Sequence, residues 1–357
     1  MKTLNRLPLL IIFLTLGMIL TVHANREAMA EQAEQIELRL ATYGSPESGM
    51  VSEGIIWYAD ELAKRTKGNV KIKIFWGGSI AKIMELPRAV KSGLADIAPV
   101  VAVYHPELFP YVFGSSQSTM VLARADLGDW NVPYRRLMEE FPEVRNVCEK
   151  QNQKMLAFWD YDRMGVISRK PVRNFEEAKG VKIRNSGEYV PRIFKAAGFS
   201  PMSVPATEAY DAVSRGMVDA IHASADTANK YRWYEACKYF TRIPIYGTAM
   251  VYFMSINLDT WKKLPMSVQN EMLRLGNELT DIKMPSISRK VREDFERNFK
   301  KAGGTFFVWP EDEQKEWKAK VTKSSMDYYV KKMEAKNIPR LKEIVYRFAE
   351  LMDYQWR

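Results

Sequence analysis

The chain has 357 residues, of which 46% are hydrophobic and 27% are charged, and its formal net charge is +10. This composition is that of a globular protein long enough for two lobes with separate cores. The cations are scattered among acidic neighbours, as in SRKVREDFERNFKKAGG (residues 288–304), and no basic tract carries interleaved aromatic residues. We therefore expect no nucleic-acid partner and favour small anionic ligands or an anionic surface.

The first 24 residues have the pattern of a secretory signal peptide. A basic start, MKTLNR, precedes an apolar stretch at residues 7–22, and small residues follow it up to Ala24. This pattern predicts export with cleavage after Ala24, and Ala30 ends a second possible cleavage site. An uncleaved membrane anchor is the alternative. We expect a soluble, exported protein.

The residues that follow alternate between strand and helix patterns. Period-two alternation predicts strands, helical spacing of apolar residues predicts helices, and closing glycines mark helix ends. The predicted elements are a strand over 36–44, a helix over 50–68, a strand over 69–79, a short helix over 83–93 and a buried strand over 94–104. This alternation is typical of an α/β sheet with helices on its faces.

A weak internal repeat links two parts of the chain. ELPRAVKSGLADIA (85–98) and EAYDAVSRGMVDAI (208–221) share five residue types in register. The matched pairs are Glu85 and Glu208, Ala89 and Ala212, Val90 and Val213, Gly93 and Gly216, and Asp96 and Asp219. Each copy reads as a helix closed by glycine and followed by a strand that begins after an aspartate. We interpret the repeat as one α/β lobe plan used twice.

The rest of the chain continues the alternation and ends in helices. The predicted elements are a helical stretch over 124–154, one or two strands over 154–168, a helix over 231–241, a strand and turn over 249–265, a helix over 267–302 and a strand over 303–310. Pro285 lies inside the long helix and is expected to kink it. The remaining residues are mostly helical by pattern.

These elements predict an α/β fold of two lobes with a ligand cleft between them and a long helix that crosses both. The expected first lobe comprises residues 36–160 and 249–285, and the second comprises 161–248 and 286–330. Residues 331–357 form a C-terminal helical segment. Lobes joined by several crossings usually form a cleft, and clefts bind ligands.

Residues for catalysis and metal binding are scarce. Beyond the signal only His105 and His222 remain, which leaves almost no material for a histidine-based triad or zinc site. Asp160 and Asp162 flank Arg163, which should keep both carboxylates ionised rather than raise a pKa. No nucleotide-binding glycine motif is present. We expect no catalytic residue, no metal and no cofactor.

Two cysteines, Cys148 and Cys237, are 89 residues apart in the sequence. A disulfide is permitted in an exported protein, and two buried thiols are an equally good interpretation.

The strongest anion-binding candidate is Arg184, in the segment GVKIRNSG (180–187). It lies at the C-terminal end of a predicted strand, where open α/β sheets place their ligands. A guanidinium presents two parallel donors that match the two oxygens of a carboxylate. From composition alone, a solvated surface charge is the more ordinary reading. The family resemblance described next favours the clamp.

The order of motifs from residue 160 to 224 resembles the DctP-type extracytoplasmic solute receptors of TRAP transporters, which import organic acids. Their pattern runs through G-x-K-x-R, a proline after Gly-Ala, x-E-x-Y-x-A and a glycine followed by aspartate. The residues here that stand in that order are Gly180, Lys182, Arg184, Pro201, Glu208, Tyr210, Ala212, Gly216 and Asp219. The segment FWGGSIAKIMELPRAVKSGLADIA is similar to the N-terminal lobe of the family, and the likeness extends over about residues 36–310.

The resemblance implies roles for two arginines. Arg184 takes the place of the arginine that clamps the ligand carboxylate, and Arg163 that of a second cation at the cleft. The family glycine after the aspartate is Ala220 here, and His222 and Ala223 replace residues that hold a metal ion in some relatives. This departure argues against a carboxylate-based cation site. His222 is either a hydrogen-bond donor to the ligand or a structural histidine.

Three aromatic residues are further candidates for the cleft. Tyr43 and Trp76 lie at the ends of the strands predicted over 36–44 and 69–79, and strand ends face the cleft in this architecture. Tyr210 follows Glu208 in the second repeat copy. For Tyr210 the alternative is a core or rim aromatic.

The resemblance implies a periplasmic solute-binding subunit, a monomer, that closes around a small carboxylate and presents it to TRAP membrane permease subunits. It does not identify the solute. A ligand-sensing periplasmic protein that feeds a signalling system uses the same cleft and is one alternative. An exported hydrolase is the other, and the missing nucleophile–base sets disfavour it.

Overall fold

The computed structural model describes residues 35–47, 49–119, 130–160, 164–185, 190–243 and 251–354. The predicted signal peptide, Arg163 and Gly187 lie outside these ranges. In the part of the chain that is described, no helix is both long enough and apolar enough to cross a membrane.

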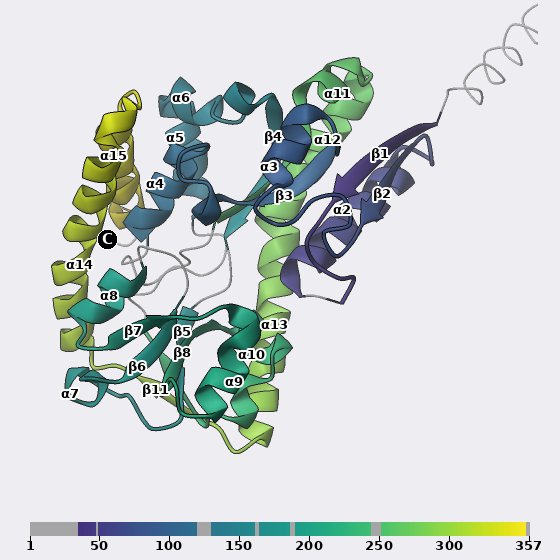
Figure 1. Ribbon diagram of the computed structural model, residues 1–357. Helices are drawn as coiled ribbons and strands as arrows, with labels where there is room; N and C mark the ends of the chain where they lie inside the picture. Colours follow the sequence, from purple (N-terminus) through teal and green to yellow (C-terminus); the bar gives the residue numbers. More distant parts are fainter. Residues whose placement is uncertain are drawn as a thin grey trace, which may run out of the picture.

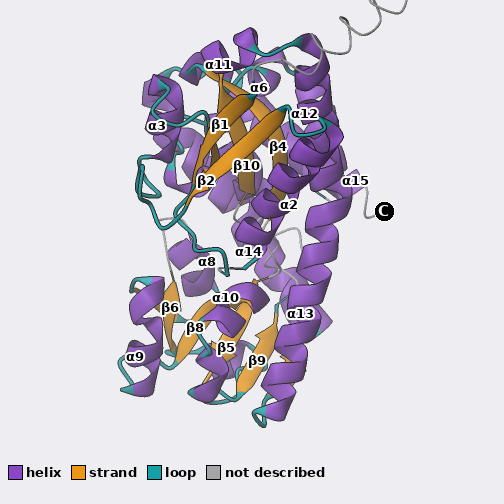
Figure 2. Ribbon diagram, turned by 90° about the vertical axis from the view of Figure 1, so that its right-hand side faces the viewer, coloured by secondary structure: helices purple, strands orange, loops and turns teal. Residues whose placement is uncertain are grey.

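Two separate sheets define two lobes, which lie one above the other in Figure 1 and Figure 2. The sheet of the first lobe has the order β2-β1-β3-β10-β4. Strands β1, β2 and β3 run parallel, and β10 pairs antiparallel with β3 and β4. The strands are β1 (Ile36–Ala41), β2 (Val70–Phe75), β3 (Ile97–Val101), β4 (Gln153–Asp160) and β10 (Val251–Asn257).

The sheet of the second lobe has the order β11-β9-β5-β8-β6-β7. Strands β7, β6 and β8 are parallel, β5 is antiparallel to both β8 and β9, and β11 is parallel to β9. The strands are β5 (Met164–Ser168), β6 (Lys182–Asn185), β7 (Ser200–Ser203), β8 (Ala220–Ser224), β9 (Tyr239–Arg242) and β11 (Thr305–Val308). Two mixed sheets with helices on their faces confirm the predicted two-lobed α/β fold.

Helices connect and cover the sheets. They are α2 (Met50–Arg65), α3 (Leu86–Ser92), α4 (Pro110–Thr119), α5 (Asn131–Glu140), α6 (Pro142–Arg145), α7 (Phe175–Ala178), α8 (Val190–Ala196), α9 (Ala209–Ser214), α10 (Ala225–Lys230), α11 (Leu258–Lys263), α12 (Met266–Glu278), α13 (Met284–Lys301), α14 (Glu311–Met333) and α15 (Leu341–Tyr354). Short 3-10 turns include η1 (Ala102–Tyr104), η3 (Ala206–Glu208), η4 (Trp233–Glu235) and η6 (Glu334–Lys336).

The internal repeat has a structural basis. Gly93 and Gly216 both adopt positive φ, 74° and 73°, at the ends of α3 and α9. Asp96 then accepts a hydrogen bond from the backbone N–H of Arg39 at 2.8 Å, and Asp219 accepts one from Lys182 at 3.1 Å. In both lobes an aspartate before a strand therefore fastens it to a neighbouring parallel strand.

The long helix predicted over 267–302 runs as α12, a π-helical turn η5 (Leu279–Lys283) and α13. Pro285 lies just after the π turn. Proline lacks a backbone N–H, and its ring clashes with the carbonyl four residues earlier, so it interrupts the regular hydrogen-bonding pattern of the helix at this point. The side chain of Thr280 donates to Gly276 O and accepts from Phe158 N. The Nδ2 of Asn131 donates to the carbonyl oxygen of Thr280 at 2.8 Å. These contacts fasten the π turn to the first lobe.

A second helix, α14, also joins the lobes, on the side opposite α13 in Figure 1. Near its start, Trp317 donates to the carbonyl of Ile193 in the second lobe at 3.0 Å. Towards its end, Tyr329 donates to the carbonyl of Pro110 in the first lobe at 2.8 Å. The lobes are therefore joined by two long helices rather than by the single one that we predicted from the sequence.

Three sequence-based expectations are corrected or settled here. The helix predicted over 231–241 is wrong, because Trp233–Glu235 form only a 3-10 turn and β9 follows it. The helical stretch predicted over 124–154 contains, among the described residues, α5, α6 and a 3-10 turn (Glu149–Gln151), and β4 begins within its last residues. Cys148 and Cys237 are both free and buried, so the two-thiol interpretation holds.

Candidate functional site

Arg184 lies near the C-terminal end of β6 and is only 5% exposed. Its Nε donates to the carbonyl oxygen of Val204 at 2.8 Å. The guanidinium carbon lies 6.0 Å from the centroid of the Trp233 ring. The backbone bond orients the head group beside the ring. Among the described residues no side chain or carbonyl accepts from its two terminal nitrogens, so these can serve a ligand.

No carboxylate among the described residues forms an ion pair with Arg184. Burial lowers the pKa of its guanidinium, and the neighbouring phenols of Tyr104 and Tyr231 oppose that shift. Placing a cation in a buried site without a counter-ion costs free energy. An anionic ligand would offset that cost.

Tyr104 and Tyr231 lie near this cation, one from each lobe, and Tyr43 and Tyr252 lie close to them. Tyr43 follows β1, Tyr104 ends η1 after β3, and Tyr252 lies in β10, all in the first lobe. Tyr231 follows α10 in the second lobe. Burial chiefly raises the pKa of Tyr43, a hydrogen bond from Tyr252 opposes the shift, and Tyr104 and Tyr231 lie near enough to raise it further. We call these four residues the tyrosine wall.

His222 lies in β8, 4% exposed, beside Arg184 in the second lobe. Strand pairing sets Arg184 opposite Ile221, so the next residue, His222, points to the other face of the sheet. Its ring lies 5.2 Å from that of Phe194. Burial, with a contribution from the charge of Arg184, lowers the pKa of His222 to about 3. This placement favours the structural interpretation of His222.

The other predicted site residues are spread more widely. Trp76 follows β2 and is partly buried against the first-lobe core. Tyr210, in α9, packs against the second-lobe cluster that contains Trp233. No described contact joins either residue to Arg184, and Arg163 lies outside the described residues. Of the predicted set, Tyr43 lies near Tyr104 and Tyr231, which neighbour Arg184, whereas His222 lies on the adjacent strand and points to the other face of the sheet.

Three tyrosines near Arg184 were not predicted from the sequence, namely Tyr104, Tyr231 and Tyr252. Tyr104 ends the segment predicted as the third strand, so the rule that selected Tyr43 would also have selected it. Tyr231 lay in a segment predicted as helix, which hid its place at a turn before a strand. Within the described ranges, no group of three or more His, Cys, Asp or Glu side chains is arranged to hold a metal ion.

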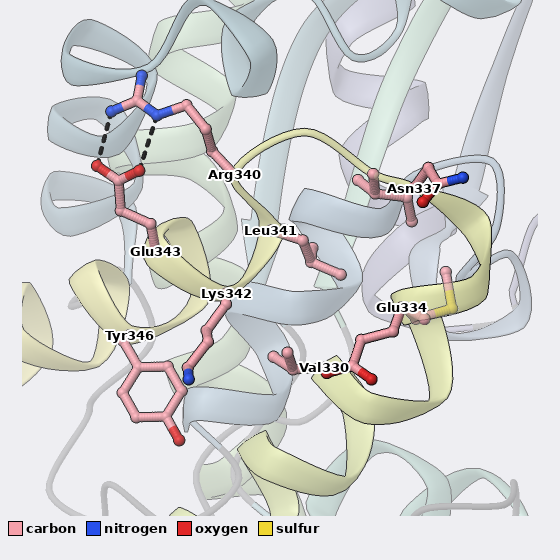
Figure 3. A pocket seen from close by; sticks show the side chains of 10 residues that line it. Val330, Glu334, Asn337, Arg340, Leu341, Lys342, Glu343 and Tyr346 are labelled. Atoms are coloured by element: carbon pink, nitrogen blue, oxygen red, sulfur yellow. Dashed lines mark hydrogen bonds and ion pairs between the residues drawn. The ribbon is translucent and has the colours of Figure 1, made fainter.

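A depression elsewhere on the surface has a different character. It lies between the end of α14 and the start of α15 and has a cavity volume of about 650 Å³ (Figure 3). Its Arg340 already donates to Glu343 through Nε at 2.8 Å and Nη2 at 2.7 Å. Because this cation is paired and exposed, we assign the anion site to Arg184 instead.

Comparison with known proteins identifies the family of the chain. Residues 43–332 match the family described as bacterial extracellular solute-binding protein, family 7 (DctP). A solute-binding protein of Albidiferax ferrireducens is 25% identical over 282 residues, which cover 78% of this chain and 80% of that protein.

Solved structures share the fold. A TRAP periplasmic solute-binding protein of Desulfovibrio salexigens superposes with a TM-score of 0.76 at 21% identity, covering 89% of this chain and 96% of that chain. A Bordetella pertussis extracytoplasmic solute receptor that binds pyroglutamic acid gives a TM-score of 0.72 at 18% identity, covering 88% and 99%. Since the family match spans most of the sequence, the chain belongs to the DctP family of bacterial extracellular solute-binding proteins.

Proposed function

We propose that this protein captures a small carboxylate-bearing organic anion in the periplasm and delivers it, chemically unchanged, to the permease subunits of a TRAP transporter. It acts as a monomer whose lobes comprise residues 36–160 with 249–285 and 161–248 with 286–330. The burial of Arg184 without a described carboxylate partner is the observation that supports this proposal.

The chemistry of the site favours a carboxylate over other ligands. The two terminal nitrogens of a guanidinium match the two oxygens of a carboxylate, and the low local polarity strengthens that pair. The tyrosine wall supplies hydroxyl groups and ring faces to the rest of the ligand. A relative that binds pyroglutamic acid is consistent with this ligand class.

A thermal-shift screen over carboxylates tests the proposal. The library includes pyroglutamate, benzoate, galacturonate, orotate and C4-dicarboxylates. A ligand at about 100 times its Kd adds roughly 2.7 kcal/mol to the free energy of unfolding, which raises the melting temperature measurably. If no carboxylate raises the melting temperature, the proposed ligand class is wrong.

Arg184→Ala tests the clamp itself, with Arg65→Ala as the matched control. Arg65 is an arginine that already pairs with Glu61 and Glu278. We expect the shift produced by the best acid to disappear in Arg184→Ala and to persist in Arg65→Ala. A full shift in Arg184→Ala would contradict the assignment.

Delivery is tested in cells. Cells that lack this protein are expected to lose uptake of the radiolabelled acid, and complementation with the wild type, but not with Arg184→Ala, restores it. Uptake that is unchanged without the protein would contradict a role in transport.

A further inference from the structure

One buried carboxylate of the second lobe, that of Asp226, contacts the first lobe. Asp226 lies in the first turn of α10 and is 6% exposed. Its Oδ1 and Oδ2 lie 2.4 Å and 2.9 Å from the point where a Cβ on Gly49 would stand. Gly49 belongs to the first lobe, where it precedes α2. The carboxylate of one lobe therefore lies against the backbone of the other.

The position that Asp226 occupies suits a negative charge. Gly49 is the N-cap of α2, a helix of 16 residues, and offers no side chain to cap it. The first residues of the helix, Met50, Val51 and Ser52, are buried, so water has little access to that end. The N–H groups of a first helical turn lack intrahelical partners and carry partial positive charge. A carboxylate from the opposite lobe complements them.

Gly49 is the residue type that permits this approach. Its φ is +85°, a conformation that side chains other than glycine rarely adopt. A Cβ there would overlap both carboxylate oxygens of Asp226. The backbone conformation and the close contact both require glycine at this position.

The contact is also near the tyrosine wall. Tyr43 precedes Gly49 by six residues, in the connection between β1 and α2. After burial, the negative charge of Asp226 is among the groups that raise the pKa of Tyr43. Arg184 and Asp226 belong to the same lobe, and Tyr43 and Gly49 to the other.

We propose that Asp226 is a positioning residue that holds the N-terminus of α2 against the second lobe and thereby keeps the first-lobe tyrosines of the wall opposite Arg184. The contact between Asp226 and Gly49 does not depend on a ligand. Its consequence for ligand affinity rests on the function proposed above, because a smaller population of the binding-competent arrangement raises the apparent Kd in proportion.

The distance between the lobes, measured without ligand, tests this proposal. Asp60, on α2, and Ser214, on α9, are exposed, so the substitutions Asp60→Cys and Ser214→Cys provide sites for nitroxide labels. The native Cys148 and Cys237 are buried and should not react with the label. In the labelled protein with Asp226→Asn, we expect the population at longer distances to rise roughly threefold to thirtyfold in pulsed electron paramagnetic resonance. The same distance distribution with and without Asp226→Asn would overturn the proposal.

Gly49→Ala perturbs the other side of the same contact, and Asp211→Asn is the control, an exposed aspartate on α9. We expect Gly49→Ala to shift the distribution as Asp226→Asn does, and the double variant to add little to either. Circular dichroism identifies the folded variants, and either folded variant with the wild-type distribution overturns the proposal. A shift of the distance distribution of equal size in Asp211→Asn would also overturn the proposal.

The acid screen separates this proposal from the function. If an acid binds, its dissociation rate should increase in Asp226→Asn, and an unchanged rate would overturn the link between the contact and affinity. If no acid binds, the proposed function fails while the distance measurement still decides the role of Asp226.

Discussion

Arg65 and Arg184 show how one residue type serves two different purposes in this protein. Arg65 ends α2, has a side chain 24% exposed, and donates to Glu61 at 3.0 Å and to Glu278 at 2.7 and 2.8 Å. Its pKa is raised, chiefly by the hydrogen bonds to Glu278. Arg184 is buried, and burial lowers its pKa without a described carboxylate to compensate. A paired arginine joins two helices, whereas a buried arginine with no carboxylate partner among the described residues suits an anionic ligand.

The same substitution at both positions gives the sharpest contrast. Arg184→Lys keeps the charge and loses the fixed pair of parallel donors, so we expect ligand affinity to fall by about 1–3 kcal/mol. Arg65→Lys should leave affinity unchanged. Isothermal titration calorimetry with the best acid of the screen measures both. Equal losses of affinity in the two variants would remove the distinction between the arginines.

The neighbour of Arg184, His222, should make the second lobe sensitive to acid. Its pKa in the folded protein is lowered to about 3 from an ordinary 6.5, so it stays neutral while the unfolded chain takes up a proton. The contribution of neutral His222 to the free energy of unfolding is intact above pH 6.5. It is lost as the pH falls towards 3, by up to ~1.4 kcal/mol per pH unit.

His222→Gln removes this titration, and urea unfolding between pH 7 and 5 measures the change. We expect stability to fall less steeply with acid in the variant than in the wild type. Parallel pH profiles would show that His222 is not held neutral. Ligand affinity should stay flat from pH 8 to 5, because neither Arg184 nor His222 changes charge there.

Arg65→Ala should lower stability only slightly. Partly exposed ion pairs contribute little, so we expect the melting temperature to fall by roughly 1–3 °C. Hydrogen bonds from Arg65 lower the pKa of Glu278 from 4.5. The stabilisation is therefore present above pH 4.5 and declines at lower pH, and the difference between wild type and variant should shrink there in calorimetry. A difference that grows in acid would contradict the pairing.

Tyr43→Phe is expected to have the smallest effect near Arg184. It removes one hydroxyl from the tyrosine wall, together with the hydrogen bond from Tyr252, and keeps the ring. We expect a loss of about 0.5–1.5 kcal/mol in ligand affinity, measured by calorimetry with the same acid. A loss clearly larger than that of Arg184→Lys would mean that Tyr43, rather than Arg184, dominates binding.

Local patterns predicted the fold better than they predicted the site. Period-two alternation located β1 and β2, and the repeated Gly–Asp spacing located the ends of α3 and α9. The prediction failed at β9, because YRWYEACKYFT has apolar residues at helical spacing and acquires its strand only by pairing with β5 and β11. Element types that depend on distant partners are not encoded in a local period.

The sequence by itself determined the two-lobed α/β plan and nominated Arg184, because strand ends, glycine caps and the motif around Arg184 are local features. Only the tertiary structure decided that Arg184 lies buried without a described carboxylate, that His222 points to the opposite sheet face, and that α14 joins the lobes. It also placed Asp226 against Gly49, 177 residues away in the chain. Burial and charge pairing arise between segments that meet only on folding, so no local pattern reports them.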